Sequence, residues 1–315
     1  MKLKQWFVNT QIPKGVCMIT HIAQQRVLLT HFTASAQSKK PSLVHLNFFN
    51  SIDIPSPVSF SDQLKDNVIR LGLEKANCVY VLPLEEYRLI LLEAPNVPDT
   101  EMTQAAKWLV KDLIDFPVSE IALDVFDAPI RIGQKRKIYV VVTRLKYVQA
   151  ISDQIEAAQL KLTRITIMHL GIRAFLSQLP QASLGVGFLH VHEQEVRFLI
   201  VKDGVLYLER KLINLSAEIS ELNDLSQSEN LLLEIQRSLD FYQSQMGQAA
   251  PEKLYLDPAL GIHAVLIQQL LLKLLVKVEV LDINQWIEYE RPLSQEEQHW
   301  MLPLAGMSLN FLQGQ

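Results

Sequence analysis

The chain has 315 residues, of which 49% are apolar and 20% charged, and its 30 basic and 34 acidic side chains give a formal net charge of −4. This composition excludes disordered and fibrous chains and is typical of a globular protein of about two domains. The near-neutral balance gives no reason to expect a nucleic-acid partner. Two cysteines, Cys17 and Cys78, are too few for a disulfide framework and indicate a reducing compartment.

Hydrophobic periodicity predicts that the first half begins with three strands, a helix and a fourth strand. A separate block follows, and after it come a helix, a strand and a helix. The predicted strands are 17–22, 26–32, 43–49, 78–82 and 163–168, and the helices are 61–71, 146–158 and 171–179. The block, 83–143, is predicted to contain strands 88–92, 122–126 and 137–143 and a helix over 100–114. This block is therefore interpreted as a subdomain inserted in the first half.

The second half repeats the same order of elements from Gly185 onward. The predicted strands are 186–191, 196–202, 205–212, 253–257 and 277–281, and the helices are 228–246, 259–275 and one from about 295. Asp203 and Gly204 predict a tight hairpin turn between two of these strands. The sequence thus predicts an α/β protein with duplicated βββαβαβα lobes, 1–180 and 181–315. That arrangement describes the actin, hexokinase and Hsp70 architecture, and two unrelated α/β domains are the alternative.

A mean hydropathy of +0.11 is high for a freely soluble chain, yet no stretch predicts a membrane span. The most apolar segment, 259–280, is interrupted by Gln268, Gln269, Lys273 and Lys277, so it falls short of the ~18 apolar residues that a spanning helix requires. The N-terminus lacks the apolar core of a signal peptide. We therefore expect a cytoplasmic protein whose excess apolarity serves a large core, a partner surface, or both.

Four segments resemble the PilM family of pilus assembly proteins, and most closely its MshI branch from the mannose-sensitive haemagglutinin (MSHA) pilus system. These segments are 101–126, 161–173, 201–210 and 233–247. The resemblance implies an actin-like fold and a scaffold role in a type IV pilus inner-membrane assembly platform. It implies as partner the cytoplasmic N-terminal tail of a PilN- or MshJ-like membrane protein, captured as an extended peptide against the first lobe and its insert. Contacts with the assembly ATPase or platform protein, and peripheral association with the inner membrane through these partners, follow from the same resemblance.

The resemblance also indicates where a nucleotide would bind, because actin-like proteins hold phosphates and Mg²⁺ with two Asp-x-Gly hairpins and border the adenosine with a Gly-Gly pair. None of these motif residues is present here. The matching positions are His21 and Ala23 in the first hairpin, His190 and His192 in the second, and Asp257 and Pro258 at the Gly-Gly pair. Bulky side chains block the approach of phosphate, and imidazole is a poor Mg²⁺ ligand. We expect a degenerate site and no cofactor; an active protein that binds Mg-ATP is the alternative.

Two further groups of residues have both a structural and a functional interpretation. One predicted helix carries Glu234, Arg237 and Ser238. Either Glu234 and Arg237 form a surface ion pair, or this helix lies at the interdomain cleft. His190 and His192 lie on one strand face, a spacing that suits Zn or Fe, but the carboxylate that a cupin-like motif would place further on is missing. We expect no metal site. No catalytic residues are predicted, since the chain has no phosphate loop, nucleophile elbow or His-Glu-x-x-His motif.

A second functional interpretation concerns the secretion system. A family of type II secretion membrane proteins carries an actin-like cytoplasmic half, so a cytoplasmic scaffold of type II secretion is an alternative to the pilus role. Those proteins usually continue into a spanning helix, which this sequence does not predict. The pilus scaffold is therefore the preferred expectation.

Overall fold

The computed structural model describes residues 14–23, 25–34, 44–54, 60–132, 135–192, 195–214, 225–262 and 264–313. Its first sheet has the order β14-β3-β2-β1-β4-β8. The strands are β1 (Val16–Ala23), β2 (Arg26–Ala34), β3 (Val44–Asp53), β4 (Asn77–Leu82), β8 (Lys161–Ile167) and β14 (Ile287–Glu288). Strands β1, β2 and β3 form an antiparallel meander, and β4 and β8 continue the sheet in parallel from β1.

The second sheet has the order β11-β10-β9-β12-β13. Its strands are β9 (Val186–His192), β10 (Glu195–Lys202), β11 (Val205–Asn214), β12 (Lys253–Leu256) and β13 (Lys277–Val280). The predicted turn between β10 and β11 forms at Asp203 and Gly204, which both have positive φ. If the strands of each lobe are numbered in chain order, both sheets contain the order 3-2-1-4-5. The predicted duplication of one topology is therefore confirmed.

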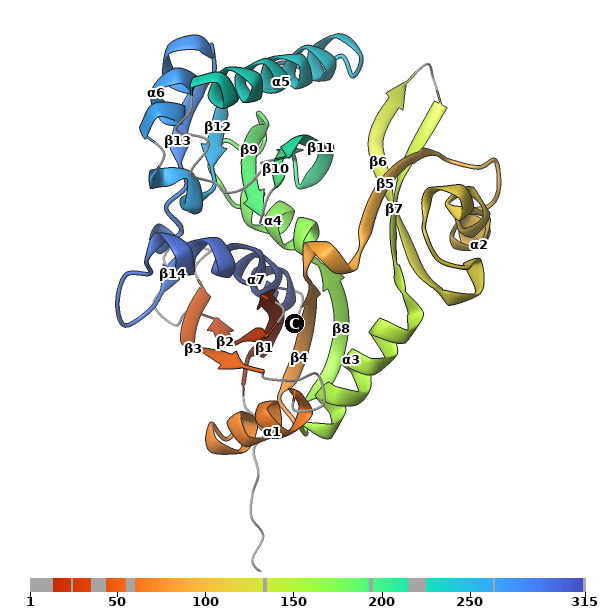
Figure 1. The fold of residues 1–315 in the computed structure, drawn as a ribbon, viewed down its shortest axis with the longest axis vertical. Helices are drawn as coiled ribbons and strands as arrows, with labels where there is room; N and C mark the ends of the chain where they lie inside the picture. Colours follow the sequence, from red (N-terminus) through yellow and green to blue (C-terminus); the bar gives the residue numbers. More distant parts are fainter. Residues whose placement is uncertain are drawn as a thin grey trace, which may run out of the picture.

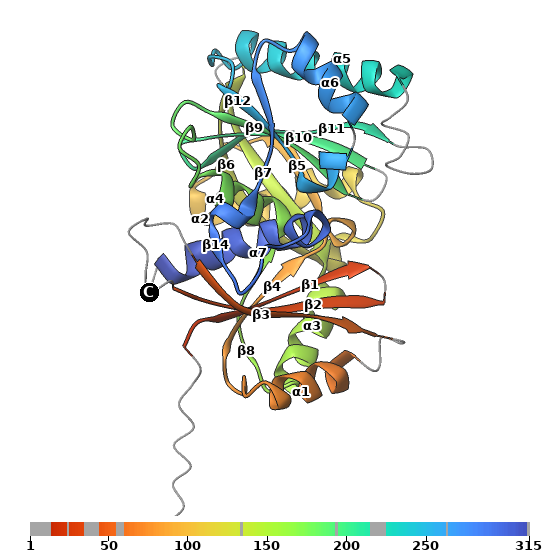
Figure 2. The same cartoon turned by 90° about the vertical axis from the view of Figure 1, so that its left-hand side faces the viewer.

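Helices form three layers around the two sheets (Figures 1 and 2). Helices α1 (Phe60–Arg70) and α3 (Leu145–Ala157) pack on the outer face of the first sheet, and α5 (Leu225–Ser244) and α6 (Ala264–Lys273) on the outer face of the second. Between the sheets, α4 (Met168–Leu176) and α7 (Gln295–Gln313) form the middle layer. The core around α4 and α7 includes side chains of both sheets, which joins the two lobes into one packed body.

The crossing of α4 and α7 is unusually close. A Cβ atom on Gly171 of α4 would lie 2.2 Å from the carbonyl oxygen of Pro303, and one on Gly306 of α7 would lie 1.9 Å from that of Gly171. Only glycine allows the two backbones to approach this far. Two glycines on facing helices therefore set the position of the middle layer.

The inserted subdomain has its own sheet and core (Figure 1). Strands β5 (Arg88–Glu93), β7 (Lys135–Arg144) and β6 (Ile121–Ile132) lie in that order and are antiparallel. Helix α2 (Asp99–Leu109) covers one face, where Met102 and Ala106 pack against Val140 and its neighbours. The short 3₁₀ turns are η2 (Leu84–Glu86), η3 (Lys111–Leu113), η4 (Val118–Glu120), η6 (Pro258–Ile262) and η7 (Ile283–Gln285).

The last part of the chain returns to the first lobe. Strand β14 pairs in parallel with β3, and α7 packs against β1, β2 and β3. The sequence predicts this segment within 181–315 and does not predict β14, because two residues carry no periodic signal. Two predicted helices are also shorter in the structure. The helix over 100–114 ends at Leu109 and continues as η3, and the helix over 259–275 is divided into η6 and α6.

Candidate functional site

Two residues at the predicted nucleotide positions meet at the edge of the second sheet. Strands β9 and β12 are parallel neighbours, so their carboxyl ends lie together, and ligands of open α/β sheets bind at such edges. His190 near the end of β9 and Asp257 just after β12 are both buried. His190 Nδ1 lies 2.6 Å from Asp257 Oδ2.

A third side chain, His299 of α7, completes the cluster from the middle layer. Its Nδ1 lies 2.8 Å from Asp257 Oδ1, and its ring stacks on that of His190 with 5.4 Å between centroids. Asp257 Oδ1 also accepts a hydrogen bond from the backbone N–H of Ala259. We call His190, Asp257 and His299 the buried histidine–aspartate cluster. It ties α7 to the end of the second sheet.

The charges of the cluster follow from its burial and its contacts. Burial alone would raise the pKa of Asp257, but the attraction of His299 and the two imidazole hydrogen bonds hold it well below its usual value. Burial likewise opposes the charged form of His299, yet Asp257 outweighs it and raises the pKa of His299. Burial lowers the pKa of His190 to about 4. Between about pH 5 and pH 6.5 the cluster therefore holds a carboxylate, an imidazolium and a neutral imidazole.

The geometry of the cluster is that of hydrogen bonds. The three groups lie close enough together to be considered as metal ligands. A tetrahedral zinc ion with bonds of about 2.0–2.1 Å would hold its ligand atoms about 3.3 Å apart. The nitrogen-to-oxygen distances of 2.6 and 2.8 Å are shorter and match charge-assisted hydrogen bonds. Both oxygens of the Asp257 carboxylate thus already accept hydrogen bonds from imidazole N–H groups of this chain.

His192, at the second predicted position, bridges to the first lobe. Its Nε2 contacts Glu85 Oε1 of η2, and its ring meets Trp300 edge-on. Burial would raise the pKa of Glu85, but the contact with His192 outweighs it and lowers that pKa. Pro258 is buried and begins η6. The end of β9 and the start of η6 therefore lie side by side at this edge of the second sheet.

The first predicted hairpin lies apart from this cluster. His21 points to the outer face of the first sheet, where its Nδ1 lies 2.6 Å from the Tyr80 hydroxyl and its ring contacts Phe60 of α1. Burial lowers its pKa to about 4. Ala23 ends β1, where it pairs with Arg26. The structure thus does not bring His21 to His190, because the side chains of β1 alternate and His21 shares the face of α1 and α3.

The three predicted residues of α5 lie on the outer face of the second sheet, away from the layer between the sheets (Figure 1). Arg237 donates to Glu234 Oε1, and Arg210 of β11 lies 3.5 Å from the same carboxylate. Ser238 donates to the Glu234 carbonyl oxygen. These contacts match the surface ion pair that the helical spacing predicts.

A cavity of about 700 Å³ lies between the insert and the second lobe. Leu84, Leu89 and Leu113 form apolar parts of its wall, and Glu85, His192 and Lys211 are among its polar residues. Strand β5 borders it and pairs only with β7 in the described part of the chain, so one edge of β5 is open. An open strand edge beside a cavity can accept an extended peptide.

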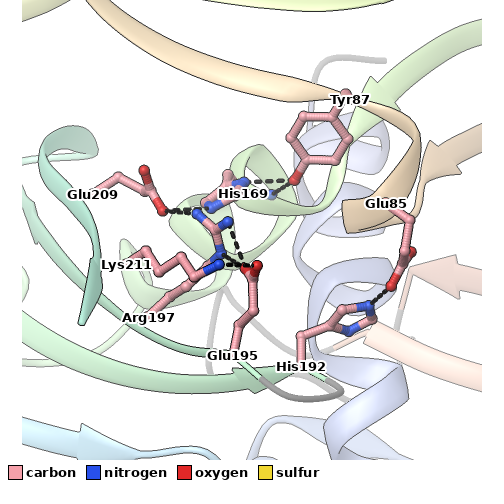
Figure 3. A network of polar contacts seen from close by, with 8 residues as sticks. All are labelled: Glu85, Tyr87, His169, His192, Glu195, Arg197, Glu209 and Lys211. Carbon is pink, nitrogen blue, oxygen red and sulfur yellow. Dashed lines mark hydrogen bonds and ion pairs between the residues drawn. The ribbon is translucent and has the colours of Figure 1, made fainter. Parts of the chain in front are cut away.

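A polar network lines this cavity, and its side chains are drawn in Figure 3. The Tyr87 hydroxyl lies 2.5 Å from His169 Nδ1, and His169 Nε2 lies 3.3 Å from Glu209 Oε1. Arg197 donates to both Glu209 and Glu195. Lys211 contacts Glu195 as well. The network joins η2 and α4 to the second sheet.

Apart from His192, neither the members of this network nor His299 could be found from the sequence. Their partners lie far apart along the chain, so spacing carries no signal for them: Glu85 and His192 are 107 residues apart, for example. A contact between a buried histidine and a buried carboxylate can be recognised only from the folded arrangement of both lobes. Helix α5 and β9, by contrast, were found by their periodicity.

The fold is shared with known structures, although no family model matches the chain and no curated protein matches its sequence. The structure of a PilM–PilN type IV pilus biogenesis complex is similar with a TM-score of 0.67 and 16% identity, over 95% of this chain and 99% of that one. The cytoplasmic domain of EpsL, an inner-membrane component of the type II secretion system of Vibrio cholerae, gives a TM-score of 0.51 at 12% identity, over 92% and 95%. A Bacteroides thetaiotaomicron protein with an actin-like ATPase fold and unknown function gives 0.52 at 11%, over 89% and 94%. The predicted actin-like fold is confirmed.

Proposed function

We propose that this protein is a cytoplasmic scaffold of a type IV pilus inner-membrane assembly platform and that it binds the tail of a PilN-like membrane protein. The observation that carries the proposal is the likeness to the PilM–PilN complex structure over nearly the whole of both chains. The resemblance of four sequence segments to the MshI branch supports an MSHA-type system with a MshJ-like partner. No helix in the described residues is long and apolar enough to cross a membrane, which fits attachment through that partner.

We place the tail in the cavity between the insert and the second lobe. Strand β5 offers its open edge there, so an extended peptide can add as a fourth strand through backbone hydrogen bonds. Leu89 and Leu113 line the same cavity and would contact every second side chain of the peptide. Leu113 is 44% exposed in the absence of a partner, and Trp108 and Leu109 beside it are exposed too. This apolar surface supports a docking role for the insert.

The proposal is tested by titrating a peptide of the partner's cytoplasmic tail into the protein by isothermal titration calorimetry. We expect saturable binding, and Leu113→Glu weakens it at least about tenfold because a charge replaces an apolar wall. Leu272→Glu, on the exposed surface of α6, is the matched control and leaves binding unchanged. Absence of binding by the unaltered protein contradicts the proposal, and equal binding by both variants contradicts the placement.

We further propose that the nucleotide site is degenerate. The carboxylate of Asp257 is occupied by two imidazoles, and His190 and His192 fill positions where an actin-like ATPase has Asp and Gly. Calorimetry with Mg-ATP is expected to show no binding at micromolar concentrations. Micromolar binding would overturn this point and favour an active ATP-binding pilus protein.

The likeness to the EpsL cytoplasmic domain favours a second candidate, a scaffold of type II secretion. The two candidates differ in the membrane partner whose tail they bind. Titration with tail peptides of both kinds, from the same organism as the chain, separates them. Binding of only the secretion peptide would replace the pilus role with this second one.

A further inference from the structure

The C-terminal end of α2 exposes apolar side chains that the insert does not use for its own core. Met102, Ala106 and Val110 follow one another at intervals of four residues and pack against the sheet of the insert. With 3.6 residues per turn, Trp108 falls on the opposite side of the helix, where it is 64% exposed. Leu109 beside it is 45% exposed. Helix α2 lies on the side of the insert that faces away from both lobes, so its exposed side is an outer surface (Figure 1).

Two lysines flank these apolar side chains, one in the last turn of α2 and one at the start of η3. Within the described residues, neither Lys107 nor Lys111 has an ion pair or a hydrogen bond from its side chain. The other basic side chains described in the insert each contact a carboxylate; they are Arg88, Lys135, Arg136 and Lys137. Asp112 offsets one of the two lysine charges, and Glu101 lies at the opposite end of α2. The end of the helix therefore keeps a positive charge that no carboxylate of the described chain neutralises.

We propose that Lys107, Trp108, Leu109 and Lys111, together called the α2 corner, bind the interface of an anionic lipid bilayer. An indole ring is apolar with one polar N–H at its edge, so tryptophan favours the level of the lipid headgroups. Leu109 adds apolar area beside the ring. Lysine side chains lay their stems along apolar surface and keep their ammonium groups in the headgroup region, where they attract anionic lipids. The corner thus combines the apolar and the charged groups that such an interface attracts.

The position of the corner favours a bilayer over a second copy of the chain. Leu113 lines the cavity in which we place the tail of the membrane protein, whereas Trp108 is not among its described lining residues. A tail that leaves this cavity continues to its own membrane segment, so the surface next to the cavity faces the bilayer; this step rests on the proposed function. A symmetric pairing of two corners would instead bring the unpaired lysines of both copies together, which like charges oppose.

The contact acts together with the tail rather than in place of it. One tryptophan, one leucine and two lysines give weak and reversible binding, since stable attachment to a bilayer needs two signals. A tail in the cavity is such a second signal. Each attachment holds the other at a high effective concentration, so the two together bind the protein to the membrane far longer than either alone.

Co-sedimentation of the full chain with vesicles tests the corner in the absence of any tail peptide. We expect binding to vesicles of phosphatidylcholine and phosphatidylglycerol, and weaker binding to phosphatidylcholine alone or at a salt concentration of about 1 M. Trp108→Ser should lower the partition coefficient at least about tenfold. Lys107→Gln and Lys111→Gln should lower it about fivefold each. Leu272→Ser of α6 and Lys277→Gln of β13 are the matched controls, because both are exposed in the second lobe, and they keep the binding of the unaltered protein.

Quenching of tryptophan fluorescence by brominated lipids identifies the side chain in contact. Trp286 and Trp300 pack against the core around α4 and α7, whereas Trp108 is exposed. Trp108→Phe keeps an aromatic ring, so it should still bind the vesicles but show less quenching than the unaltered protein.

Three results would overturn the inference. They are no binding to anionic vesicles, an equal loss of binding in Leu272→Ser and Trp108→Ser, and a dimer in sedimentation velocity that Trp108→Ser dissociates. The last result would assign the surface to a contact between two copies of the chain. Each of them leaves the proposed function standing, because binding of the tail peptide is measured without lipid.

Discussion

Replacement of Asp257 by asparagine is the sharpest probe of the buried histidine–aspartate cluster. Asp257 is fully buried, and its two oxygens accept from His190, His299 and the backbone of Ala259. Asparagine has nearly the same shape but no charge, and it has an NH₂ group in place of one acceptor oxygen. The protonated His299 then lacks its counter-charge, and one imidazole N–H faces another donor.

The expected loss of stability depends on pH. Removing one partner of a buried ion pair costs about 3–5 kcal/mol when the other charge stays. At pH 7 His299 of the variant can instead lose its proton, so we expect the lower end, about 3 kcal/mol. Below about pH 6.5 the unfolded variant binds a proton that the folded variant does not, so its stability falls by about 1.4 kcal/mol per pH unit. The unaltered protein keeps His299 protonated in both states there and shows no such slope from this group.

Urea unfolding followed by circular dichroism at pH 5.5, 6.5 and 7.5 measures both quantities. Asp282→Asn is the matched control, because within the described residues that exposed side chain accepts from local groups near η7. Asp282→Asn should lower the free energy of unfolding by less than about 1 kcal/mol, and by the same amount over this pH range. A loss below about 1 kcal/mol for Asp257→Asn at pH 7, or one that does not grow in acid, would refute the assigned charges.

Two other substitutions and the reactivity of the two thiols have defined outcomes. Gly306→Ala places a Cβ against a carbonyl of α4 and should lower the free energy of unfolding by at least about 2 kcal/mol in a urea titration. Ser294→Ala removes the hydroxyl that accepts from the Glu297 N–H at the start of α7 and should cost about 0.5–2 kcal/mol, measured by thermal unfolding. Burial raises the pKa of Cys17 to about 12 and that of Cys78 well above its usual value, so neither thiol should react with a disulfide reagent at pH 8 until the protein unfolds.

The order of elements was predictable because most of them carry a local signal. Strands β9, β10 and β11 alternate or run apolar between turn residues, and Asp203 with Gly204 marks the hairpin. Alternation along β1 also decides where His21 lies. Ile19 and His21 lie two residues apart on β1 and so share a face, and Ile19 packs in the outer core. His21 therefore lies away from the layer between the sheets, but the sequence alone does not say which face of β1 is the outer one.

The candidate site was only partly predictable. His190 and Asp257 follow from the parallel pairing of β9 and β12, which the βαβ order indicates. His299 does not, because the return of α7 to the first sheet depends on tertiary packing around Gly171 and Gly306. The cavity beside β5 was not predictable either, since its wall combines the insert with a hairpin of the other lobe.

The return of β14 and α7 to the first sheet has a consequence for synthesis on the ribosome. Strand β3 gains its neighbour β14, and β1 and β2 gain their cover from α7, only after almost the whole chain has been made. Until then the inner face of the first sheet, with Met18 and Phe32, has no helix α7 to exclude water. The first half to be synthesised is therefore among the last parts to be completed, and a nascent chain stalled before α7 should depend on chaperones.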